Sequence, residues 1–139
     1  MLWPVAIVVL STVLYHAAQK SIPAAAPPVA SLLVSYGVAL LGTLALLPFF
    51  PLRAPVGRSF RQLNWASAAI GVTIVGVELG FLLAYRAGWR VSVGAAVSNA
   101  AVAALLIPVG LIAFGERLSG VNVLGLLLCV AGLILAVAR

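Results

Sequence analysis

The run VSVGAAVSNAAVAALLIPVGLIAFG, residues 91–115, carries no charged side chain. A helix needs about 20 mostly apolar residues to cross a bilayer, so this run is long enough to span a membrane. Residues 62–85 form a similar run, interrupted by the single charge of Glu78. The other charge-free runs are residues 1–19 (with His16 neutral), 21–52 and 118–138. None of them alternates polar and apolar residues as β-barrel strands do. The sequence therefore predicts an all-α membrane protein.

The composition points the same way. Hydrophobic residues make up 65% of the 139 residues and charged residues only 7%, against about 25% charged in a soluble domain. This excludes a soluble enzyme, a disordered chain and a disulfide scaffold. The positive charges are spread between the apolar runs, so no basic face for nucleic acid is expected. No basic residue precedes the first apolar run, so a cleaved signal peptide is not expected. We predict a multi-pass protein of the inner (plasma) membrane.

The spacing of these runs predicts one domain, residues 1–139, with five membrane-spanning helices. The sequence AAAPP at 24–28 and Pro51 fall between helices, because proline lacks a backbone N–H group. Ser119 is placed to cap the last helix. Gly76 and Gly80 form a G-x-x-x-G pair, which allows close helix packing in lipid. The helices are expected near residues 2–20, 29–50, 65–86, 92–114 and 119–138.

The positive charges are balanced across the predicted membrane. Orientation normally follows an excess of Lys and Arg on one side, but here four fall on each side. In one interpretation the chain inserts both ways and pairs as an antiparallel homodimer. In the other, the three-arginine connection alone sets the orientation and the tie is accidental. The two sets are Arg53, Arg58, Arg61 and Arg117 against Lys20, Arg86, Arg90 and Arg139.

Glu78 is the residue most indicative of function. A carboxylate near the bilayer centre costs a few kcal/mol unless it is protonated, paired or faces a water-filled cavity. Such a carboxyl could exchange a proton for a cationic substrate. Phe81 and Tyr85 follow at i+3 and i+7 and share its helix face, where aromatic rings would suit an organic cation. The alternatives are a hydrogen-bonded structural carboxyl and ordinary aromatic packing.

Two further helices carry candidate site residues. Tyr15 and His16 lie in the first helix, and His16 could relay protons, since histidine changes charge near neutral pH. His16 is equally consistent with an ordinary histidine at the membrane interface, and Lys20 with a snorkelling anchor. In the fourth predicted helix, Asn99 either joins helices or binds a ligand, because an amide in lipid seeks a polar partner.

Other chemistry is not expected. The chain has one histidine, one cysteine and no aspartate, so neither a metal site nor another cofactor is predicted. A glycine-rich phosphate-binding loop is absent, and no motif supports a hydrolytic triad. We therefore predict that the protein is not an enzyme.

The C-terminal part of the chain resembles the EamA-type domain of the drug/metabolite transporter superfamily. The resemblance rests on GERLS at 115–119, LG at 124–125, AGLIL at 131–135 and YRAG at 85–88, with Lys20 at a position where such domains often have lysine. It implies a five-helix half-unit, since most members contain two inverted halves with the substrate site between them. It also implies a structural role for Glu116. Short multidrug exporters of the superfamily have an essential Glu in their first helix, which this chain lacks.

These observations leave three hypotheses open. The first is a homodimeric, possibly antiparallel, secondary transporter of small metabolites or organic cations, coupled to protons through Glu78. The second is a subunit of a lipid or lipid-linked sugar flippase, in which Arg86 and Arg90 contact a phosphate. The third is a non-transporting assembly subunit of a larger membrane complex.

Overall fold

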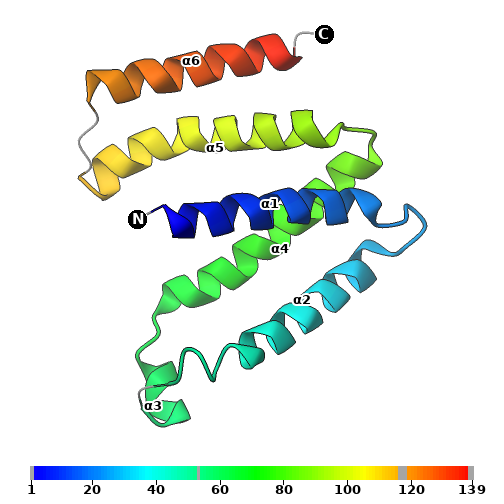
Figure 1. Cartoon of the computed structure of the whole chain (residues 1–139), viewed down its shortest axis with the longest axis vertical. Helices are drawn as coiled ribbons and strands as arrows, with labels where there is room; N and C mark the ends of the chain where they lie inside the picture. Colours follow the sequence, from blue (N-terminus) through cyan, green and yellow to red (C-terminus); the bar gives the residue numbers. More distant parts are fainter. Residues whose placement is uncertain (1, 53, 116–118, 138–139) are drawn as a thin grey trace. The chain divides into compact units, whose positions relative to one another are not determined.

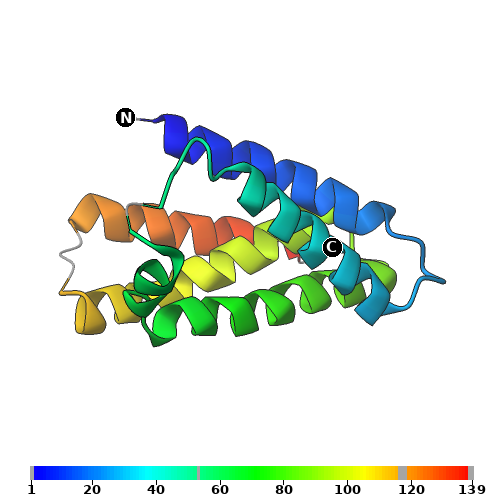
Figure 2. The same cartoon turned by 90° about the horizontal axis from the view of Figure 1, so that it is seen from below.

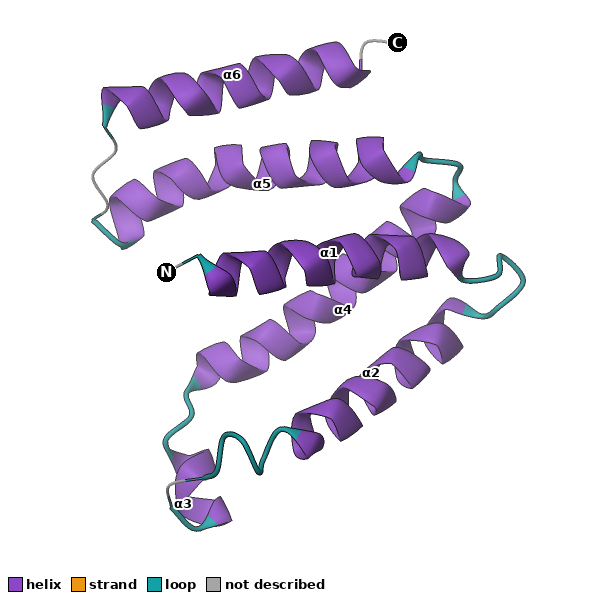
Figure 3. Cartoon of the chain, in the orientation of Figure 1, coloured by secondary structure: helices purple, strands orange, loops and turns teal. Residues whose placement is uncertain are grey.

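The computed structural model describes residues 2–52, 54–115 and 119–137. Within these ranges every regular element is a helix (Figure 3), which confirms the predicted all-α class. The elements are α1 (Trp3–Ser21), α2 (Pro28–Ala45), α3 (Val56–Arg61), α4 (Trp65–Arg86), α5 (Val91–Ala113) and α6 (Gly120–Val137). Three of them, α2, α4 and α5, are long and apolar enough to cross a bilayer, which indicates a membrane protein. Membrane crossing by α1 and α6 stays a prediction.

The connection between α2 and α4 differs from the prediction. The helix expected to reach residue 50 ends at Ala45, with Leu46 as its C-cap. Pro48 explains the early end, because proline disfavours helical backbone at the residue before it and cannot donate to the preceding turn. After Pro55 the chain forms the unpredicted helix α3 before entering α4 (Figure 2). The Ser59 hydroxyl donates to the Ala54 carbonyl at 3.0 Å and closes the start of this helix.

The described chain divides into two compact units, residues 1–17 with 87–139 and residues 18–86. In the unit 18–86, α2 packs against α4 and the two run antiparallel (Figure 1). Leu32 of α2 and Leu82 and Tyr85 of α4 are its buried apolar side chains. In the other unit, α5 packs against α6, also antiparallel (Figure 1). Gly94 and Gly110 are the buried residues of α5.

Two glycines stop helices where the backbone must turn. Gly88 follows α4 with φ +94°, and Gly115 follows α5 with φ +62°. Both occupy the second position after the last helical residue, where the left-handed conformation favours glycine. At the start of α6, the Ser119 hydroxyl accepts the Asn122 N–H at 3.2 Å. This contact confirms Ser119 as the predicted N-cap.

The surface of the chain is strongly apolar. Long aliphatic side chains such as Leu10, Leu33 and Leu105 are each more than 60% exposed. The predicted G-x-x-x-G pair also faces outward, with no atom within 4 Å of the point where a Cβ would stand on Gly76 or Gly80. Lipid is the solvent that suits such a surface, because exposed apolar patches of this extent are not found on soluble monomers.

Candidate functional site

Polar side chains of the unit 18–86 gather where the end of α1 and the connection 22–27 meet α4. Three contacts carry this junction. Gln19 Nε2 donates to the Glu78 carbonyl at 3.5 Å, and Lys20 Nζ donates to the Tyr85 carbonyl at 3.1 Å. Arg86 Nη2 donates to the Ala26 carbonyl at 2.6 Å. All three acceptors are backbone carbonyls, and two of the side chains come from α1.

Glu78 lies about two-thirds of the way along α4 and is half-buried. Its Oε2 atom is buried and has no hydrogen-bond partner among the described residues. The hydroxyl of Tyr36, on α2, is also buried without a partner in that part of the chain. The packed helices α2 and α4 thus each carry a buried polar atom whose hydrogen-bonding capacity is unused among the described residues.

Toward its C-terminal end, α4 turns its aromatic residues to the same junction. The rings of Phe81 and Tyr85 stack with their centroids 5.9 Å apart. Tyr85 is 4% exposed, and Lys20 Nζ lies 5.9 Å from its ring centroid. The aromatic face that was expected to receive an organic cation already meets a cation of the chain at Tyr85.

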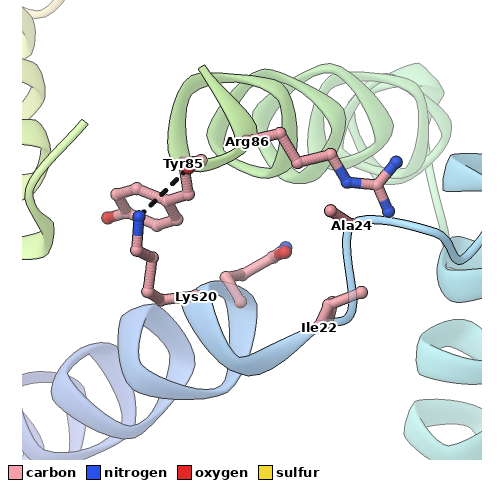
Figure 4. A pocket seen from close by; sticks show the side chains of 6 residues that line it. Lys20, Ile22, Ala24, Tyr85 and Arg86 are labelled. Atoms are coloured by element: carbon pink, nitrogen blue, oxygen red, sulfur yellow. Dashed lines mark hydrogen bonds between the residues drawn. The ribbon is translucent and has the colours of Figure 1, made fainter. Parts of the chain in front are cut away.

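A pocket of about 240 Å³ opens at the junction (Figure 4). Its wall is formed by the end of α1, the connection after it and the last turn of α4. The lining residues are Gln19, Lys20, Ile22, Ala24, Tyr85 and Arg86. They carry two positive charges and no negative one.

The remaining predicted site residues belong to the other compact unit. There Tyr15 and His16 form an edge-to-face pair with ring centroids 5.2 Å apart. His16 is 5% exposed, and its position at the membrane interface stays a prediction. Asn99 and Arg90 are exposed. The structure thus brings Phe81 and Tyr85 into contact and places Tyr85 and Arg86 in one pocket, whereas a site shared with the residues of this unit stays a prediction.

Sequence reasoning missed Tyr36 and the role of the α1–α2 connection. Tyr36 could have been found in the sequence, because it is the one aromatic residue of the helix 28–45. The carbonyls of Pro23 and Ala26 had none, because a backbone acceptor carries no mark in a sequence. Lys20 was expected to snorkel as a simple anchor, but it bonds to the C-terminal turn of α4, where carbonyls lack helical partners and a cation is favourable.

No metal site is indicated in the described ranges, which contain no cluster of three or more His, Cys, Asp or Glu side chains. The motif residues Glu116 and Arg117 lie outside the described residues. Comparison of the chain with protein-family models, curated proteins and solved structures gives no match in any of the three. The resemblance to an EamA-type domain therefore stays a prediction, and the function has to be argued from the site.

Proposed function

We propose that the protein is a secondary transporter in which Glu78 binds a proton and a cationic solute in alternation. The observation that carries the proposal is the buried Oε2 atom of Glu78, which has no hydrogen-bond partner among the described residues. Glu78 lies in α4, a candidate membrane-spanning helix. A charged carboxylate in such a place is costly, and either a proton or a bound cation offsets that cost. The two occupants then exclude each other, which is the requirement for exchange.

Tyr36 and Phe81 fit the same role. The Tyr36 hydroxyl can donate to the Glu78 carboxylate or accept from its protonated form. Phe81 is half-buried one turn further along α4, and an aromatic ring beside a carboxylate favours an organic cation. These residues would bind a small apolar cation more tightly than a strongly hydrated metal ion.

A second copy of the chain would complete the transporter. Families built from inverted halves place the substrate site between the halves, and the resemblance assigns this chain the size of one half. The balanced positive charges allow the two copies to insert in opposite orientations. The outward-facing pair Gly76 and Gly80 leaves room for another helix to approach α4. We therefore include an antiparallel homodimer in the proposal, with one Glu78 from each copy near the shared site.

The test is proton-coupled uptake of tetraphenylphosphonium by proteoliposomes that contain the purified chain. We expect Glu78→Gln to lower coupled uptake by about a hundredfold or more, because positioned proton-transfer groups contribute at least this much, and to abolish its pH dependence. Glu78→Asp should keep part of both. The matched control is Glu116→Gln, which removes the other acid of the chain and should leave the pH dependence unchanged.

Mixing the two proteins tests the homodimer. If each site needs two Glu78 carboxyls, an equal mixture of wild type and Glu78→Gln at constant total protein keeps only about a quarter of the wild-type activity, because random pairing leaves one dimer in four with both carboxyls. A loss in simple proportion to the variant would contradict the shared site. Full coupled uptake by Glu78→Gln alone would remove Glu78 from the mechanism.

A further inference from the structure

The pocket at the end of α4 has a chemistry that the transport proposal does not use. Its two charged lining residues, Lys20 and Arg86, are both cations, and they come from different elements. Figure 4 shows their charged groups on opposite sides of the pocket. Within the described residues the only acidic side chain is Glu78, which does not line the pocket. The local charge therefore favours an anionic ligand.

Arg86 is held in place but keeps hydrogen-bond donors. Its Nη2 group donates to the Ala26 carbonyl at 2.6 Å and to the Pro23 carbonyl at 3.4 Å. Its Nε group is buried and has no acceptor among the described residues. A guanidinium has five N–H donors, so these two bonds orient the group without using all of them. An oriented guanidinium is suited to bidentate contact with phosphate oxygens.

Lys20 supplies the second charge in a form that can adapt. Its amino group stands on a flexible four-carbon stem and lies beside Tyr85 in the wall of the pocket (Figure 4). The sequence predicted that Arg86 and Arg90 contact a phosphate, and a joint role of these two arginines stays a prediction. The cation that shares a pocket with Arg86 is Lys20.

The position of the pocket in the chain restricts the ligand. Arg86 ends one candidate membrane span, Trp65–Arg86, and the connection 22–27 precedes another, Pro28–Ala45. The pocket therefore lies at the level where a membrane helix meets the polar head groups. Basic pockets between membrane helices at this level bind the head groups of anionic lipids.

We propose that the pocket lined by Lys20 and Arg86 binds a phosphate group, supplied either by the head group of an anionic phospholipid or by a soluble phosphate. Arg86 contacts the phosphate oxygens directly, and Lys20 closes over the anion from the other side. Ile22 and Ala24 give the pocket an apolar edge toward the connection, which suits the glycerol and first acyl carbons of a lipid. The site is independent of Glu78, so a transporter could carry a structural lipid there.

The test uses the purified full chain in a neutral detergent. It is titrated separately with dihexanoyl phosphatidylglycerol and with inorganic phosphate, and the thermal unfolding midpoint is followed. A ligand that binds only the folded state raises this midpoint saturably. We expect saturable stabilisation of the wild type and an apparent Kd about tenfold weaker in Lys20→Gln and in Arg86→Gln, because one charge-assisted hydrogen bond is worth about this factor.

Three controls make the outcome decisive. Arg86→Lys keeps the charge and should retain part of the binding, which covers the case in which Arg86→Gln does not fold. Arg58→Gln removes an arginine of α3 and should bind like the wild type. Glu78→Gln should also bind phosphate like the wild type. A failure of the transport proposal can therefore be distinguished from a failure of the phosphate-site proposal.

The two ligands distinguish the sources. Saturation by phosphatidylglycerol alone identifies a lipid head-group site, and saturation by inorganic phosphate as well identifies a site for soluble phosphates. Either result supports the proposal. Absence of saturable stabilisation by both ligands, or equal affinity in the wild type, Lys20→Gln and Arg86→Lys, would overturn it.

Discussion

The two compact units join their elements by different means. In the unit 18–86, side chains of α1 and α4 reach backbone carbonyls of other elements, as Lys20 does at Tyr85 and Arg86 at Ala26. In the described part of α5 and α6, side-chain hydrogen bonds stay local. Ser98 Oγ donates to the Gly94 carbonyl one turn earlier, at 2.7 Å, and Ser119 caps its own helix. The helix pair α5–α6 therefore packs through small and apolar surfaces.

This difference bears on whether the polar side chains around α4 are needed for helix packing. Lipid gives little hydrophobic drive for helices to associate, so packing and hydrogen bonds have to hold them together. In α5, which packs against α6, the buried residues are the glycines Gly94 and Gly110. Around α4, by contrast, two buried polar atoms, Glu78 Oε2 and Tyr36 OH, have no hydrogen-bond partner among the described residues, and we propose that they are retained for function.

The largest expected effect on stability tests the core of the α2–α4 pair. Leu82 is 1% exposed and its neighbour Leu83 is 50% exposed. Leu82→Ala leaves a cavity and should cost toward the lower end of about 2–5 kcal/mol, because the unfolded helix also stays in an apolar solvent. Leu83→Ala is the matched control and should change stability by less than about 0.5 kcal/mol. The measurement is the free energy of unfolding in mixed micelles.

The same substitution on α5 sharpens the comparison. Leu105 is 70% exposed, and the buried residues of α5 are glycines. Leu105→Ala should therefore behave like Leu83→Ala. A loss at Leu105 as large as that at Leu82 would show that the α5–α6 pair has a side-chain core of its own, and the contrast between the two units would fail.

The sequence predicted the helices better than their contacts. The bounds of α4 agree with the expected 65–86, and those of α5 lie within one residue of 92–114, because charged residues and glycine mark both ends. The predicted end of α2 was wrong because Pro48 ends the helix inside an apolar run that continues beyond it. The short helix α3 was missed because six residues carry little periodicity.

The sequence predicted only those parts of the site whose residues lie on one face of a single helix. Glu78, Phe81 and Tyr85 share a face of α4 through their spacing, and the structure places all three on the side that meets other elements. The burial of Tyr36 OH and the contact of Arg86 with the carbonyl of Ala26 depend on how separate elements pack. No spacing in one sequence encodes those distances.

A smaller effect, of opposite sign, tests whether Tyr36 is retained for function. A buried hydroxyl without a partner costs about 1–3 kcal/mol, so Tyr36→Phe should stabilise the protein by about 1 kcal/mol. The same change should slow proton-coupled uptake if the Tyr36 hydroxyl, on the helix packed against α4, assists Glu78 as we propose. Unfolding in mixed micelles and uptake by proteoliposomes are measured on the same preparation. Lower stability together with unchanged uptake would make Tyr36 an ordinary structural residue and weaken the functional interpretation of this unit.

The smallest effect tests whether the two units respond separately. Ser119→Ala removes the hydroxyl that accepts the Asn122 N–H, and an N-cap of this kind is worth about 1 kcal/mol. Asparagine caps as well as serine, so Ser119→Asn should restore the loss. Amide hydrogen exchange, followed helix by helix, should show faster exchange at the start of α6 and unchanged exchange in α2 and α4. If α2 and α4 exchange faster as well, the units unfold together, and the polar contacts around α4 also stabilise α5 and α6.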